Sequence, residues 1–226
     1  MPTPRLFFDP SQIKRISSGK ELKDLKKHLN IALVLVEYRI SQLNKGHFSK
    51  MSPNEQLSIK ARFGLNVKDV VQYEEIRKQL LTISQKLRTS IKAELYTLNT
   101  RPELGIFYRD FNPSNKEFYG YTNLANDRYP NFIGLTDKYF SKNNVLGNNT
   151  NAGILIHELS HQVRNGGSLD IDQRFYGERG SENLNNILNG NANLRHADSL
   201  EFYFEDASQS NYVRNKLGIG NNVPRL

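Results

Sequence analysis

The sequence contains no cysteine and no tryptophan, and it has only two methionines. Without cysteine the chain forms no disulfide and offers no thiolate to a metal ion. Any metal site must therefore be built from His, Asp or Glu side chains, which favours hard or borderline ions such as zinc. At 226 residues the chain is long enough to bury an apolar core without crosslinks.

Long hydrophobic runs are also missing. The longest, "IALVLV" at 31–36, is far shorter than the roughly 20 apolar residues that span a bilayer. The opening residues, "MPTPRLFFDPSQ", lack the basic segment and apolar stretch of a signal peptide. We therefore expect no membrane-spanning helix, and either a cytosolic start or a chain from which a leader has been trimmed.

Acidic residues are in the minority, because 31 Lys and Arg face 23 Asp and Glu, a net charge of +8. Such a charge can favour nucleic acid, anionic membranes or acidic proteins as partners. The basic residues are scattered, however, and no nucleic-acid-binding motif is present. We expect no specific nucleic-acid partner.

Helical periodicity dominates the first part of the chain. Apolar residues recur at three- and four-residue spacing over 22–43 and stop at Gly46, which predicts an amphipathic helix. "MSPNEQLSIKARFG" predicts a second helix with Ser52 as its N-cap and Gly64 past its end. The segment 67–98 predicts a long third helix.

Strand patterns follow. "LGIFYRDF", "KEFYGYTNL" and "NFIGLTDKYF" are aromatic and partly alternating, and turn residues separate them, which predicts a small sheet. Helices are then expected over 154–163 and from about 193 to 207. The predicted fold class is α+β, mostly helical with a small antiparallel or mixed sheet. We expect a helical extension over 1–50 and one compact domain over 51–226.

One motif stands out in "ILIHELSHQVRNGGSLDIDQRFYG". His157 and His161 are one helical turn apart, so both imidazoles project from the same face and can bind one metal ion. Glu158 is then placed to take a proton from a water that zinc activates, which makes it the candidate general base. This HExxH pattern is typical of zinc peptidases. His28 and His47 lie outside it and are expected to be surface residues.

A catalytic zinc takes three protein ligands and keeps one position for water, so a third donor is needed. The pattern HExxHxxGxxH is not met, because Arg164 and Gly167 stand where it requires Gly and His. Asp170 follows a glycine turn at the predicted helix end. Downstream glutamates that fit no matching motif are Glu178, Glu182 and Glu201.

The turn "RNGGS" followed by Asp170 resembles the aspzincins, the family of deuterolysin and peptidyl-Lys metalloendopeptidase. These enzymes combine HExxH with an Arg-Asn-Gly-Gly-Thr-like turn, an aspartate ligand and a Tyr-Gly pair. "NTNAGILIHELSH", "NFIGLTDKYF", "ARFG" and "HADSLEFYFED" are similar to other family segments, so the resemblance covers about 53–208. It implies a zincin-like fold.

The resemblance implies one zinc ion per chain, held by His157, His161 and Asp170, with Glu158 as the base. It also implies that Tyr176 stabilises the oxyanion of the reaction. In the family this tyrosine follows the ligand aspartate by three residues, whereas Tyr176 follows Asp170 by six. Asp172 therefore remains an alternative ligand.

Asp198 and Glu201 correspond to the family's acidic pair, and they share one face of the predicted last helix. Their family role implies binding of a lysine side chain at P1′, the position just after the scissile bond. Without the resemblance they would be solvated helix charges. His196 stands where the family typically has Asn. We expect the strand at 132–135 to bind the substrate backbone as an added strand.

The expected function is that of a zinc metalloendopeptidase acting on proteins or peptides. Because a signal peptide and disulfides are missing, we expect a bacterial effector or toxin domain that is secreted or translocated into a target cell. The alternative is an inactive or partner-restricted binding module with a peptidase-like fold, which uses its basic surface to hold a partner.

Overall fold

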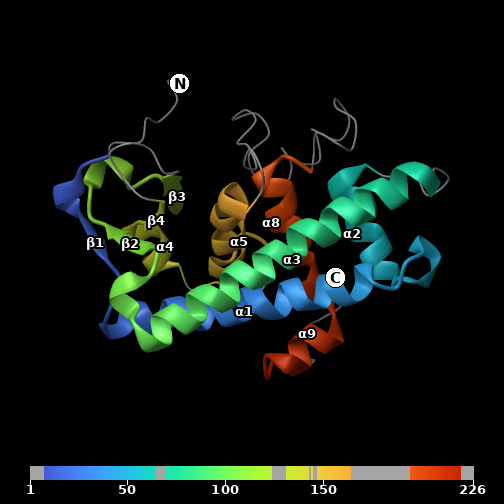
Figure 1. Ribbon diagram of the computed structural model, residues 1–226, viewed down its shortest axis with the longest axis horizontal. Helices are drawn as coiled ribbons and strands as arrows, with labels where there is room; N and C mark the ends of the chain where they lie inside the picture. The colour runs from blue at the N-terminus through green and yellow to red at the C-terminus, as the bar shows by residue number, and fades with distance from the viewer. Residues whose placement is uncertain are drawn as a thin grey trace.

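Helices carry most of the fold, and a small sheet lies at one end of it (Figure 1). The computed structural model describes residues 8–64, 70–123, 131–142, 144, 147–163 and 194–219. The α-helices in these segments are α1 (Gly19–Leu43), α2 (Pro53–Phe63), α3 (Val70–Thr100), α4 (Asp137–Ser141), α5 (Asn151–Val163), α8 (Ala197–Glu205) and α9 (Asn211–Lys216). The strands are β1 (Ile13–Arg15), β2 (Phe107–Asp110), β3 (Gly120–Asn123) and β4 (Phe132–Leu135). Among the helices described here, none has the length and apolar character needed to cross a membrane.

The predicted helices of the first part of the chain are confirmed. The hydroxyl of Ser52 accepts the N–H of Glu55 at the start of α2, and Pro53 takes the first helical position. Gly64 ends this helix with φ 63°, a left-handed conformation that glycine adopts without a steric penalty. Helix α1 buries its apolar stripe, including Leu25 and Leu29, against α3 and α5.

The predicted mixed sheet is also confirmed, with the strand order β1-β2-β4-β3. Strand β2 is parallel to β4, while the β1–β2 and β3–β4 pairs are antiparallel. Strand β4 lies between β2 and β3 and is paired on both sides. The expectation that 132–135 binds substrate as an added strand is therefore wrong. In the described part of the sheet, β3 is the edge strand beside α5.

Several short elements were not expected from the sequence. Strand β1 and helices α4 and α9 are too short for a periodic pattern to mark them. The last predicted helix, expected from about residue 193, begins as α8 at Ala197. His28, expected on the surface, is half-buried, and its Nδ1 lies 2.9 Å from the hydroxyl of Tyr139. Burial lowers the pKa of His28 to about 4.

A buried polar cluster, named here the Arg39 cluster, joins α1, α2 and α8. Arg39, which is 1% exposed, pairs with Glu55 and donates to the backbone carbonyl of Tyr203 and to the hydroxyl of Ser58. The Tyr203 hydroxyl in turn donates to Glu55 Oε1 at 2.7 Å. Because these bonds reach the middle of α8, the cluster fixes where that helix lies.

Candidate metal centre and substrate pocket

Helix α5 positions the two histidines of the HELSH sequence. Most of this helix is buried, and it packs between β3 on one side and α8 on the other (Figure 1). The rings of His157 and His161 lie next to each other, with centroids 5.1 Å apart. Two imidazoles on one tetrahedral zinc have ring centres roughly 5 Å apart, since each ligand nitrogen lies about 2 Å from the metal. The pair therefore fits a shared zinc ion.

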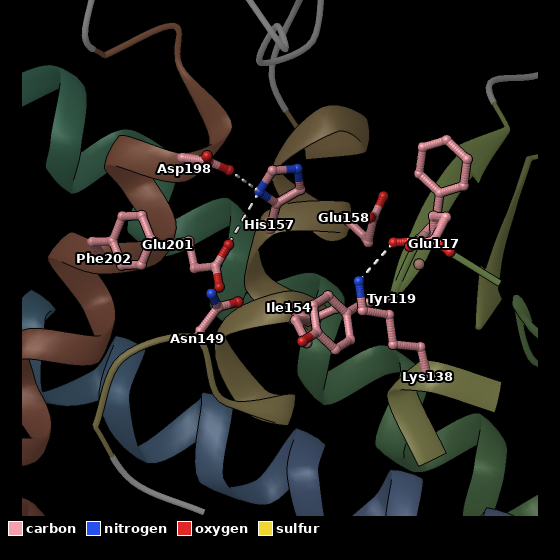
Figure 2. A pocket seen from close by; sticks show the side chains of 12 residues that line it. Glu117, Tyr119, Lys138, Asn149, Ile154, His157, Glu158, Asp198, Glu201 and Phe202 are labelled. Atoms are coloured by element: carbon pink, nitrogen blue, oxygen red, sulfur yellow. Dashed lines mark hydrogen bonds and ion pairs between the residues drawn. The ribbon is translucent and has the colours of Figure 1, made fainter. Parts of the chain in front are cut away.

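Two carboxylates of α8 contact the first histidine of the pair (Figure 2). His157 Nδ1 lies 2.9 Å from Asp198 Oδ1 and 3.2 Å from Glu201 Oε2. A carboxylate accepts, so Nδ1 is the donor and Nε2 is left as the metal-binding nitrogen. This contact was not expected from the sequence, which assigned both acids to substrate binding alone.

Both acids are buried, each 5% exposed, and the Oε1 atom of Glu201 has no hydrogen-bond partner among the described residues. Burial raises the pKa of the Glu201 carboxyl; the hydrogen bond and charge of His157 oppose this rise, and the nearby Asp198 and Glu158 reinforce it. An oxygen of this kind is a ready acceptor for a cation entering the pocket.

Glu158 points away from α8, toward the sheet. The hydroxyl of Thr122 on β3 lies 2.9 Å from Glu158 Oε2 and 2.8 Å from its backbone oxygen. Glu158 is 5% exposed, yet it lines the pocket beside His157. Thr122 can therefore fix the orientation of the Glu158 carboxylate. No sequence signal identified Thr122, because a lone threonine in a short strand matches no motif.

The pocket has a volume of about 260 Å³ and two unlike walls. Asp198 and Glu201 form the acidic wall, while Tyr119 and Lys138 lie across from them (Figure 2). Lys138 Nζ donates to the backbone oxygen of Glu117 at 2.7 Å and lies over the Tyr119 ring. A space of this size suits single side chains rather than a large cofactor.

The structure thus brings together part of the predicted site. His157, Glu158, Asp198 and Glu201 all line one pocket, and His161 lies beside His157. The remaining predicted residues fall outside the described part of the chain: Asp170, Asp172, Tyr176, Glu178 and Glu182.

A second group within the described residues also has the composition of a metal site. His157, Asp198 and Glu201 each offer a ligand atom, and these atoms lie within 4.8 Å of one another. The group shares His157 with the HELSH pair, through the nitrogen opposite to the one that the pair would use. The two arrangements therefore use different nitrogens of one imidazole.

Two neighbouring imidazoles, with a carboxylate on the far nitrogen of one of them, have the ligand chemistry of a zinc site. A solved zinc peptidase from Grifola frondosa has a similar fold: it superposes with a TM-score of 0.59 at 18% identity, covering 84% of this chain and 96% of that one. The family model described as lysine-specific metallo-endopeptidase, aspzincin M35, matches residues 75–205. The chain belongs to the aspzincin family.

A relative in Pleurotus ostreatus, a peptidyl-Lys metalloendopeptidase, is 33% identical over 93 residues. The match covers 41% of this chain and 51% of the relative, so the chain spans about half the length of that protein. The resemblance drawn from the sequence motifs is thereby confirmed at the level of the family.

Proposed function

We propose that this protein is a zinc-dependent endopeptidase that hydrolyses peptide bonds in proteins. The observation that carries the proposal is the placement of His157 and Glu158 in one pocket, with Asp198 against Nδ1 of the histidine. A carboxylate on the far nitrogen is the usual support for a zinc-binding histidine. Membership of a metallo-endopeptidase family supports the same conclusion.

The proposed ligands are His157 and His161, with Asp170 as the third and Asp172 as its alternative, for one zinc ion per chain. When bound there, zinc would act as a Lewis acid that polarises the scissile carbonyl. It would also lower the pKa of the attacking water, which makes that water a better nucleophile. Asp198 and Glu201 would keep the His157 ring oriented and its Nε2 free of a proton.

Glu158 is the proposed general base. Its carboxylate would take a proton from the attacking water and deliver it to the leaving amine, so that no net proton is gained or lost. The Thr122 hydroxyl lies against Glu158 Oε2, and Glu158 lines the pocket. Tyr176 remains the proposed stabiliser of the oxyanion.

Substrate would bind along β3 rather than along β4, since β3 has the edge position beside Glu158. The substrate backbone would then extend the sheet as an added strand. A P1′ lysine would place its ammonium against Asp198 and Glu201. The acidic wall of the pocket supports this preference, as does the name of the Pleurotus relative, a peptidyl-Lys metalloendopeptidase.

The test is to incubate the protein with a denatured protein mixture and to sequence the new N-termini by mass spectrometry. We expect cleavage before lysine by the wild type, and a loss of about 10²- to 10⁴-fold in Glu158→Gln. Both proteins should bind zinc equally, as measured by metal analysis. Glu117→Gln, a change at an exposed glutamate that lines the same pocket, is the matched control and should remain active. Zinc binding without cleavage by the wild type would favour the binding module instead.

A further inference from the structure

Helix α8 carries a third buried carboxylate, Glu205, in addition to the two that form the acidic wall. Glu205 follows Glu201 by one helical turn, is 1% exposed, and reaches the start of α5. Its Oε2 accepts the N–H of Asn149 at 2.6 Å, and its Oε1 accepts the N–H of Thr150. Both donors belong to the two residues that immediately precede α5, which begins at Asn151. Glu205 therefore accepts from the approach to α5 and does so from another helix.

The space for this carboxylate exists because residue 153 is glycine. A Cβ added at Gly153 would overlap the carboxylate of Glu205. Because Gly153 and Glu205 are both buried, neither can easily move aside. Gly153 has no left-handed φ that would require glycine, so close approach is the physical reason for glycine here. Helices α5 and α8 are thus fixed in one register.

The same contact shapes the floor of the pocket. Asn149, which lines the pocket, has φ 59°, a left-handed conformation that asparagine tolerates better than most residues. Its backbone N–H is the one held by Glu205. Figure 2 shows Asn149 beside Glu201, whose Oε1 has no hydrogen-bond partner among the described residues. Glu205 therefore holds the backbone of the pocket floor at Asn149, one helical turn from Glu201 on the acidic wall.

We propose that Glu205 is a positioning residue for P1′ selection: it holds the backbone at Asn149, beside Glu201, where a lysine ammonium would bind. This inference rests on the proposed function. Glu205 touches neither the pair of histidines nor Glu158 in the described contacts, so its loss should change how the substrate side chain binds more than it changes the chemical step.

The chain provides a matched control for Glu205. Glu94 on α3 is also a buried glutamate, 7% exposed, that accepts a backbone N–H, from Ile106 at 2.8 Å. It too lies against a glycine, since a Cβ at Gly105 would be 2.8 Å from Glu94 Oε1. Glu94 does not line the pocket. Replacing it tests the general cost of losing such a contact.

The first measurement uses n-butylamine, which has the chemistry of a lysine side chain, in an NMR titration of the zinc-loaded protein. We expect Glu205→Ala to weaken butylammonium binding about tenfold and Glu94→Ala to leave it within about twofold. With peptides differing only at P1′, Glu205→Ala should lower the ratio of kcat/KM for lysine over arginine about tenfold, mainly through KM.

The second measurement tests the contact itself by thermal unfolding. Gly153→Ala should lower the Tm of the wild type by roughly 5 °C, because the new methyl group overpacks the site. In a Glu205→Ala background the same substitution should cost little, since the carboxylate is gone. Equal shifts in both backgrounds would show that the two residues are not coupled.

The proposal is overturned if Glu205→Ala lowers the Tm but leaves both the butylamine affinity and the lysine preference unchanged. If Glu205→Ala does not fold, Glu205→Gln against Glu94→Gln gives the same comparison with the side-chain shape kept. If the wild type cuts no peptide, the proposed function fails. The butylamine titration still decides in that case whether Glu205 shapes an ammonium site.

Discussion

Two groups of carboxylates lie on and beside α8, and they are held by different kinds of donor. On one side the buried Glu55 pairs with Arg39, and the half-buried Asp206 pairs with Arg62 at 3.0 Å. On the other side the carboxylates of α8 are held by an imidazole and by backbone N–H groups, as Glu201 and Glu205 show.

The difference is one of charge. A guanidinium neutralises its carboxylate fully, so the Arg39 cluster is closed and structural. Backbone N–H groups satisfy hydrogen bonds but leave the negative charge of a carboxylate in place, and so would an imidazole that zinc keeps free of a proton at Nε2. A pocket built on such donors keeps an attraction for a cation, which in the proposed function is the substrate lysine.

The largest effect on stability should come from breaking the Arg39 cluster. Glu55→Ala leaves the Arg39 guanidinium buried without its carboxylate, and we expect a loss of about 3–5 kcal/mol in the free energy of unfolding. Denaturant titration measures this loss. Glu37→Ala, which removes a surface pair with Lys92 in which both partners are at least 40% exposed, should cost less than about 1 kcal/mol. Similar losses in both variants would show that burial gives the Arg39–Glu55 pair no special structural weight.

The pocket side should respond in the opposite way. Because burial raises the pKa of Glu201, its charge is costly to the fold, and Glu201→Gln should leave the Tm unchanged or higher. The same variant should lower the preference for lysine over arginine at P1′ by about 10- to 100-fold, a loss of about 1.4–2.7 kcal/mol. If Glu201→Gln lowers the Tm and leaves the preference for lysine over arginine unchanged, Glu201 belongs with the structural carboxylates.

The half-buried His28 adds a test by pH. Burial lowers the pKa of His28 from 6.5 to about 4, so the unfolded chain binds a proton in this window that the folded chain does not. Stability should therefore fall as the pH decreases from 6.5 to 4, by at most about 3 kcal/mol, and then level off. His28→Gln should lose this dependence in Tm measurements across that range. His47→Gln, a change at an exposed histidine, should keep it.

The smallest effect is expected at Thr122. Thr122→Val keeps the shape of the side chain but removes the hydroxyl that lies 2.9 Å from Glu158 Oε2. We expect kcat to fall about tenfold with KM nearly unchanged, since a misoriented base affects the chemical step. Steady-state kinetics on a lysine peptide separates the two constants, and a change confined to KM would argue against this role.

Local features of the fold were predictable because their causes lie close together in the chain. The Ser52 cap, the Gly64 helix end and the HELSH pair each depend on neighbouring residues. The order of strands in a sheet depends on residues far apart in the chain. The sequence pattern therefore placed substrate on β4, which the structure shows to be an interior strand.

The site itself shows the same limit. The acidic pair was predicted from its family motif, but its contact with His157 arises from the packing of α5 against α8, which no local pattern records. Thr122 and Glu205 were missed for the same reason. Each acts on a residue far away in sequence.

The most direct test is the position of zinc in a crystal of the zinc-loaded protein, located by anomalous diffraction at the zinc absorption edge. We expect one strong peak bonded to Nε2 of His157 and to His161, with Asp198 and Glu201 remaining on Nδ1. A peak bonded to His157 Nδ1, Asp198 and Glu201 would contradict it, because the acidic wall would then hold the metal and not the substrate.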